Sequence, residues 1–211
     1  MRFFRPSHLL FVVLALTACV GGGVRDPQAL ADCNQREEPE RTIDGCTTLL
    51  LVGKLNQRQR IAALSLRSAA FLKTEDDRRA MLDAKEILSI DAESAIGWSR
   101  KHSVHLHRGE GEKAIEAAMR EIEFSDGHSR GYLNLAAGYL ISKKYEEAIA
   151  VADTIEAQAP DDAAAMTAAD HVRRIARDQK RAHIQRLIIA LMLGVLAGAE
   201  ETETEATSED E

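Results

Sequence analysis

The chain repeats itself every 34 residues. At this offset, one pair of aromatic residues and two pairs of alanines align: Trp98 with Tyr132, Ala114 with Ala148, and Ala118 with Ala152. A period of this size is typical of proteins that stack small helical or helix-and-strand units side by side. The period divides the middle of the chain into three units, at 61–94, 95–128 and 129–162.

Small and large residues hold fixed places within each unit. The residues that carry the pattern are Trp98, Ala114 and Ala118 in the middle unit, and Tyr132, Leu135, Ala136, Tyr139, Ala148, Ala152 and Pro160 in the last. This pattern resembles the tetratricopeptide repeat. The resemblance implies an all-α fold, an α-solenoid in which each unit is a pair of antiparallel helices.

The residue types explain why such a pair packs closely. Alanines four residues apart lie on one helical face, where they let the neighbouring helix approach. No unit buries its apolar face alone, so stacking supplies the stability. In the middle unit His102 and His105 replace the small residue and the aromatic usual in the family, and this predicts less regular packing there.

The first residues of the chain resemble an export signal. Arg2 and Arg5 precede an apolar stretch that is too short to span a bilayer. The stretch ends in Leu16-Thr17-Ala18-Cys19, which resembles the lipobox of bacterial lipoproteins. The resemblance implies that a signal peptide, residues 1–18, is removed and that Cys19 carries lipid. The alternatives are an ordinary signal peptide or an uncleaved anchor.

Two further cysteines remain if Cys19 is lipidated. The chain has three cysteines, so Cys33 and Cys46 would then form an even pair, and a disulfide is the simplest interpretation in an oxidising compartment. Residues 19–31, rich in glycine and polar side chains, are predicted to be a flexible tether. Residues 32–60 are predicted to be a degenerate helix pair that the disulfide pins together.

The end of the chain predicts one long helix and an acidic tail. Residues 163–199 contain no helix breaker before an apolar run, Leu187 to Ala199, which at about 1.5 Å per residue is shorter than a bilayer core. Packing over the last repeat is the main interpretation; an interfacial or partner-binding segment and a short membrane anchor are alternatives. Residues 200–211 contain seven acids and no base, which predicts disorder.

No catalytic constellation is found, and no cofactor is expected. Paired acids such as Asp76-Asp77 lie at predicted turns, where helix capping explains them. His102, His105 and His107 lack a third ligand type at suitable spacing, so a metal-dependent activity there is only an alternative. The formal net charge of −7 argues against nucleic-acid binding and favours protein partners.

The family resemblance places the binding surface on the first helix of each unit. In this register a mixed, mostly apolar floor is expected, suited to an extended or helical peptide. Its residues are Leu72, Ile96, Leu106, His107, Arg130, Leu133, Leu140 and Ile141. The family's carboxylate clamp uses lysines and asparagines at the places that Ser65 and Ala69 occupy here, so the resemblance disfavours such a clamp.

These features together predict a non-enzymatic scaffold, lipid-anchored in the bacterial envelope and facing the periplasm. Val20 after Cys19 favours the outer membrane, because enteric lipoproteins retained in the inner membrane carry aspartate there. The alternative is an accessory subunit of an envelope enzyme or secretion machine, whose basic C-terminal helix contacts membrane or partner. The partner and the oligomeric state do not follow from the sequence.

Overall fold

The computed structural model describes residues 26–125 and 129–206. The predicted signal peptide, Cys19 and residues 207–211 of the acidic tail lie outside the described residues. Within them the chain forms nine helices and no strand, so the predicted all-α fold class is confirmed. The helices are α1 (Pro27–Cys33), α2 (Pro39–Val52), α3 (Gln57–Lys73), α4 (Asp77–Ile90), α5 (Ala95–His107), α6 (Gly111–Glu123), α7 (Ser129–Ile141), α8 (Tyr145–Gln158) and α9 (Ala163–Ala206).

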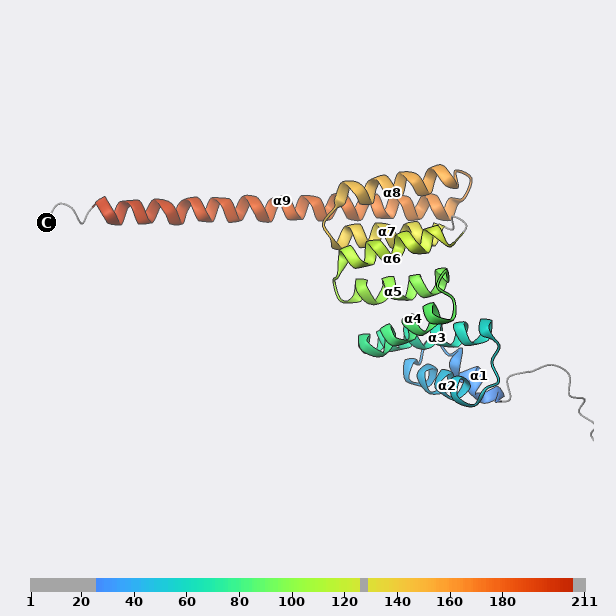
Figure 1. Ribbon diagram of the computed structural model, residues 1–211. Coiled ribbons are helices and arrows are strands. Elements are labelled where there is room, and N and C mark those ends of the chain that lie inside the picture. Colours follow the sequence, from blue (N-terminus) through green and yellow to red (C-terminus); the bar gives the residue numbers. More distant parts are fainter. Residues whose placement is uncertain (1–25, 126–128, 207–211) are drawn as a thin grey trace, which may run out of the picture.

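The helices pile up in chain order, from α1 and α2 at one end to α8 and α9 at the other (Figure 1). Each helix contacts the next one in the chain, and first helices of successive pairs also meet, α3 with α5 and α5 with α7. This arrangement is a solenoid, in which contacts are made almost entirely between neighbours.

Three predicted boundaries differ from the structure. The tether expected over 19–31 ends early, because the Asp26 carboxylate accepts from the Ala29 N–H at 2.9 Å and caps a helix that starts at Pro27. The helix pair expected over 32–60 ends at Val52. The next helix starts at Gln57 because Asn56 and Gln59 form a reciprocal capping box.

The 34-residue period recurs in the turns between paired helices. In the α3–α4, α5–α6 and α7–α8 turns, one residue lies in the left-handed region: Glu75 (φ 60°), Gly109 (φ 69°) and Lys143 (φ 59°), respectively. The next residue's N–H then donates to the carbonyl five positions earlier at 2.8–2.9 Å, in the pairs Asp76 to Phe71, Glu110 to His105 and Lys144 to Tyr139. This pattern satisfies carbonyls left free at the end of a helix, so it ends each first helix at an equivalent place.

The left-handed turns predict a stabilising substitution. The Cβ of Lys143 makes its backbone conformation at φ 59° strained, whereas glycine adopts it without strain. Among the described residues, replacing Lys143 by glycine breaks no hydrogen bond of the side chain. We expect Lys143→Gly to raise the free energy of unfolding by about 0.5–1 kcal/mol, measured by urea denaturation. Lys143→Ala is the matched control, since it removes the side chain but keeps the Cβ; equal stability of the two variants would contradict the explanation.

Small residues allow the close approach of helices within and between units. Ala114, Ala118, Ala136, Ala148 and Ala152 are completely buried, and Leu135 is 8% exposed. Glycines 34 residues apart, Gly97 and Gly131, face α4 and α6: an added Cβ would lie 2.7 Å from Leu88 Cδ2 and from Ile122 Cγ1, respectively. Substitution at either glycine would therefore force the neighbouring side chain or the stacked helix to shift.

The large residues of the repeat pattern are partly buried and make hydrogen bonds or packing contacts within and between the units. Trp98 is half-buried and its indole N–H donates to the Ala92 carbonyl at 3.0 Å. The Tyr132 hydroxyl accepts from Gln158 Nε2 at 2.8 Å, and Tyr139 packs against the same core. Pro160 is exposed between α8 and α9, where it separates the last pair from the closing helix.

The first part of α9 closes the stack. Four small or apolar residues on one face of α9 are buried in a cluster with residues of α6, α7 and α8: Ala165, Ala169, Val172 and Ala176. In addition, the Arg173 guanidinium donates to Asp153 on α8 at 2.8 Å. This part of α9 therefore packs over the last repeat, as the sequence analysis expects of the C-terminal helix. Farther along, Ile188 and Ile189 are exposed and the helix continues clear of the stack (Figure 1).

The remaining expectations about the C-terminal segment are only partly met. The main interpretation of Leu187 to Ala199 as packed over the last repeat is wrong for Leu187, Ile188 and Ile189, which are 48–57% exposed. Residues 200–206 are helical rather than disordered. No helix among the described residues combines the length and hydropathy needed to cross a bilayer.

Candidate protein-binding groove

Two adjoining cavities lie along the first helices of successive pairs. Their volumes are about 260 Å³ and 950 Å³. Both are lined by Arg36, Ser65, Leu66, Arg100 and Arg130. We call the two cavities together the inner groove. It runs from the loop between α1 and α2, across α3 and α5, to the start of α7.

The structure places three of the eight predicted groove residues in the inner groove. Ile96, Arg130 and Leu133 line the larger cavity. The other five, Leu72, Leu106, His107, Leu140 and Ile141, line neither cavity. They lie at the C-terminal ends of α3, α5 and α7, next to the left-handed turns, where Leu72 and Leu140 pack against buried clusters.

The inner groove is more basic than the mostly apolar floor that the sequence predicts. Arg36 and Arg100, neither of them among the predicted residues, join Arg130 and Lys73 on its wall. Arg36 was missed because it lies in the cap loop, outside the repeat. Arg100 was missed because it follows Ser99 by one residue, in a position that the assumed register placed away from the groove. The signal that could have found it is its place four residues after Ile96, on the same helical face.

One carboxylate, Glu121, also lines the larger cavity. It is 4% exposed and accepts from Asn134 Nδ2 at 2.6 Å. Asn134 Nδ2 also lies 3.3 Å from the Ser99 hydroxyl, so this network links α5, α6 and α7. Glu121 is thus engaged in holding three helices together.

The three histidines considered as metal ligands have separate partners. His102 is 1% exposed, and its Nδ1 lies 3.0 Å from the Ala114 carbonyl. Since a carbonyl only accepts, Nδ1 carries the proton there. Burial lowers the pKa of His102, which keeps the ring neutral.

The neighbouring histidines bind carboxylates. His105 Nδ1 lies 2.6 Å from Glu110 and His107 Nδ1 lies 2.7 Å from Asp77. The hydrogen bond from His105 lowers the pKa of the Glu110 carboxyl. Within residues 26–125 and 129–206, no three His, Cys, Asp or Glu side chains come together as a metal site. The metal-dependent alternative therefore gains no support from the described geometry.

The arrangement defines an all-helical solenoid with a hollow inner face. Folds of this class are typical of scaffolds that bind other proteins on their concave surface. No family model and no curated protein matches this sequence.

Among solved structures the chain is similar to the crystal structure of MamA, with 14% sequence identity and a TM-score of 0.52 over 76% of this chain and 95% of that one. It is also similar to a MamA RS-1 ArsTM double mutant, with 15% identity and a TM-score of 0.51 over 75% of this chain and 97% of that one. These likenesses show a shared fold, in agreement with the tetratricopeptide-type solenoid that the 34-residue period predicts.

Proposed function

We propose that this protein is a non-enzymatic scaffold that binds a partner protein in the inner groove while tethered to an envelope membrane through Cys19. The observation that carries the proposal is the groove itself, a hollow of about 950 Å³ formed by first helices that contact one another. A hollow of this size accommodates several side chains of a peptide segment.

Apolar residues give the groove its anchoring capacity. Ile96 is 48% exposed, and Leu133 is half-buried on the adjoining first helix. Side chains of a partner that cover such residues gain about 25 cal/mol for each Å² of apolar surface removed from water. Exposed apolar residues inside a cavity are therefore suited to be covered by a partner.

Charge introduction on the groove floor tests the proposal. We expect Ile96→Glu combined with Leu133→Glu to reduce recovery of crosslinked partners from cells by about tenfold or more, because carboxylates would be buried against apolar side chains. The matched control is Leu82→Glu, since Leu82 is 54% exposed on α4 but lines neither cavity. Recovery that is equal for both variants and the wild type would contradict binding in the groove.

The tether and the location form part of the same proposal. The sequence Leu16-Thr17-Ala18-Cys19 supports lipidation, and Val20 supports the periplasmic face of the outer membrane. Incorporation of labelled palmitate into the wild type but not into Cys19→Ala is the expected result. Fractionation of the two variants then tests the location, since loss of the acyl chains removes stable anchoring.

A second candidate, an accessory subunit that uses α9 to contact a membrane or partner, is favoured by one observation. Ile184, Leu187, Ile188 and Ile189 are all 45–57% exposed on the part of α9 beyond its buried contacts. Truncation after Gln185 leaves the closing contacts of α9 intact. Unchanged partner recovery by the truncated protein would argue against this candidate.

A further inference from the structure

The inner groove gathers four cationic side chains from four segments of the chain. Arg36 comes from the loop between α1 and α2, Lys73 from the end of α3, Arg100 from α5 and Arg130 from α7. All four line the smaller cavity, and the three arginines also line the larger one. Like charges repel, so an arrangement that brings them to one hollow costs free energy unless an anion offsets it.

No carboxylate of the described residues forms an ion pair with the three arginines. Within residues 26–125 and 129–206, no carboxylate lies within ion-pair distance, 4.0 Å, of the guanidinium groups of Arg36, Arg100 or Arg130. By contrast, Arg67, on the same helix as Lys73, is paired with Asp83. Glu121, the single acid among the residues lining the two cavities, is bound by Asn134.

Arg100 shows the imbalance most clearly. Its Nε is buried and has no hydrogen-bond partner in the described part of the protein. Burial lowers the pKa of the Arg100 guanidinium and the charge of Arg130 lowers it further, while Glu121 acts in the opposite sense. A guanidinium that is partly removed from water and lacks an ion-pair partner is destabilising, whereas a bidentate carboxylate would satisfy its planar donors.

We propose that Arg36, Arg100 and Arg130 form an anion-recognition site that binds the carboxylate side chains of an acidic peptide segment of a partner protein. The inference rests on the proposed function and specifies the partner's chemistry. The apolar residues Ile96 and Leu133, beside the arginines in the larger cavity, select a peptide with acidic and apolar residues close together.

The charge of the rest of the chain supports an acidic segment as the occupant. The seven acids of residues 200–211 carry the whole formal net charge of −7, so the rest of the chain is neutral overall and the groove is a local concentration of positive charge that attracts an acidic segment. Such a contrast places the segment in the groove rather than elsewhere on the surface. The volume of about 950 Å³ is also far more than one small anion fills.

A peptide-binding measurement on the purified full-length protein tests the site. The probes are a fluorescein-labelled ten-residue peptide of alternating glutamate and leucine, and the same peptide with glutamine in place of glutamate. Fluorescence anisotropy gives the affinity of each. We expect the glutamate peptide to bind about tenfold or more tightly than the glutamine peptide, and its affinity to fall as salt is raised.

The arginine variants assign the effect to the site. We expect Arg130→Gln and Arg36→Gln, both at exposed side chains, to weaken binding of the glutamate peptide about tenfold each. Arg58→Gln is the matched control, because Arg58 is an exposed arginine on α3 that lines neither cavity. Equal effects of Arg58→Gln and Arg130→Gln would overturn the proposal.

Arg100→Met gives a second readout that a purely structural arginine would not produce. Because Arg100 lacks an ion-pair partner, we expect this variant to bind the glutamate peptide less tightly yet to unfold at a temperature about 2 °C or more higher. A lowered unfolding temperature with unchanged affinity would assign Arg100 to the fold and not to recognition.

The outcomes separate this inference from the function on which it rests. Equal affinity of the two peptides, or tighter binding of a single-stranded oligothymidylate through the same arginines, overturns the acidic-peptide site. The scaffold function is judged instead by partner recovery in cells with Ile96→Glu and Leu133→Glu. If recovery of partners depends on these two residues but not on the arginines, the scaffold function is supported and only the acidic-peptide site is contradicted.

Discussion

Arg67→Met should lower the free energy of unfolding by about 3–5 kcal/mol at pH 7, because it leaves a buried carboxylate without its partner. Arg67 Nη2 and Nε donate to the two oxygens of Asp83 at 2.7 and 3.0 Å, and Nη1 donates to Thr47 at 3.1 Å. Asp83 is 3% exposed. One side chain of α3 thus joins α2 and α4, and its loss loosens three helices.

The destabilisation caused by Arg67→Met should be smaller at acid pH than at neutral pH. Burial raises the pKa of the Asp83 carboxyl, and Arg67 opposes this rise. Without Arg67 the pKa of Asp83 in the folded protein rises further, so the folded state binds a proton more tightly than the unfolded state. Stability is then greatest at acid pH and is lost as the pH rises through the raised pKa. Urea denaturation at pH 5 and pH 7.5 should show Arg67→Met to be less destabilised at pH 5.

An exposed ion pair between the same two helices provides the control. Arg60 and Glu86 also pair across α3 and α4, but their side chains are 42% and 37% exposed. Arg60→Met should therefore cost less than about 1 kcal/mol. A second variant, Arg67→Met with Asp83→Leu, removes both buried charges and should recover most of the lost stability. If Arg67→Met and Arg60→Met lowered the free energy of unfolding equally, burial of the Arg67–Asp83 pair would not explain its contribution to stability.

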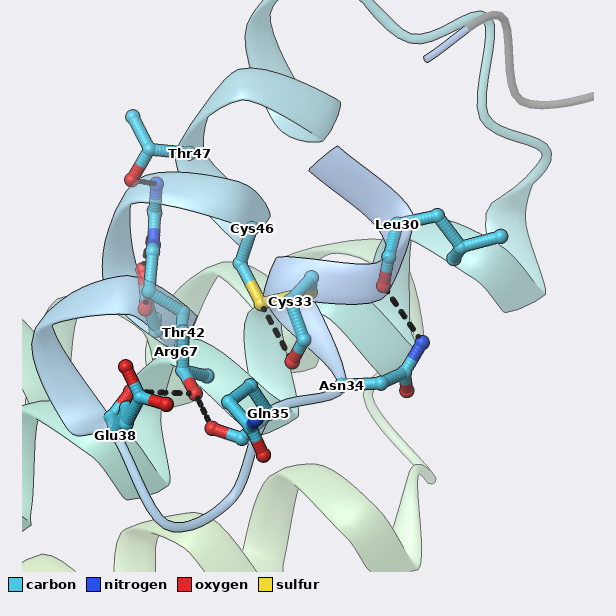
Figure 2. Close-up of a disulfide and its surroundings, with 10 residues drawn as sticks. Leu30, Cys33, Asn34, Gln35, Glu38, Thr42, Cys46, Thr47 and Arg67 are labelled. Carbon is cyan, nitrogen blue, oxygen red and sulfur yellow. Dashed lines mark hydrogen bonds and ion pairs between the residues drawn. A yellow bond between two sulfur atoms is a disulfide. The ribbon is translucent and has the colours of Figure 1, made fainter. Parts of the chain in front are cut away.

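Removal of the Cys33–Cys46 disulfide should have the next largest effect. The bond joins α1 to α2 across a sequence separation of 13, with the Cα atoms 4.5 Å apart, in agreement with the predicted pairing (Figure 2). Closing a loop of this length stabilises the fold by about 3 kcal/mol through the entropy of the unfolded chain. Cys33→Ala with Cys46→Ala should lower the free energy of unfolding by about this amount.

The loss should be concentrated at the N-terminal end of the stack. The closed loop is also held by Thr42, whose hydroxyl donates to the Gln35 carbonyl (Figure 2). Hydrogen exchange should therefore accelerate in residues 27–52 of the cysteine-free variant more than in α7 or α8. A reductant should accelerate hydrogen exchange in these residues of the wild type but not of this variant. Uniform acceleration along the chain would show that the disulfide acts on the whole solenoid.

The sequence was sufficient to predict the repeat because the period acts on backbone and side chains together. Alanines such as Ala114 and Ala148 are completely buried where the pattern placed them. The turn within each of the three repeat units also recurs at the same offset, at Glu75, Gly109 and Lys143. Such regularity is visible in a single sequence because stacked units need the same small residues and the same turn each time.

The inner groove was harder to predict because it depends on contacts between units. Arg36 belongs to the cap, far in sequence from Arg100 and Arg130, and no period relates the three. The course of α9 was also unpredictable from periodicity. Its capping part contains alanines that pack on α8, whereas Ile188 and Ile189 have the same apolar character without a neighbour to bury them.

The recurrence of the left-handed turns also determines how a solenoid of this kind can change in length. A segment of one full period begins and ends at equivalent surfaces, wherever it is cut, because successive turns share one hydrogen-bond pattern. Duplication or excision of such a segment creates only junctions of a type that the chain already makes. Insertion of a single residue within a helix instead rotates everything beyond it by about 100°, which separates the stacked faces. Growth or shortening by whole units is therefore the permitted mode of variation.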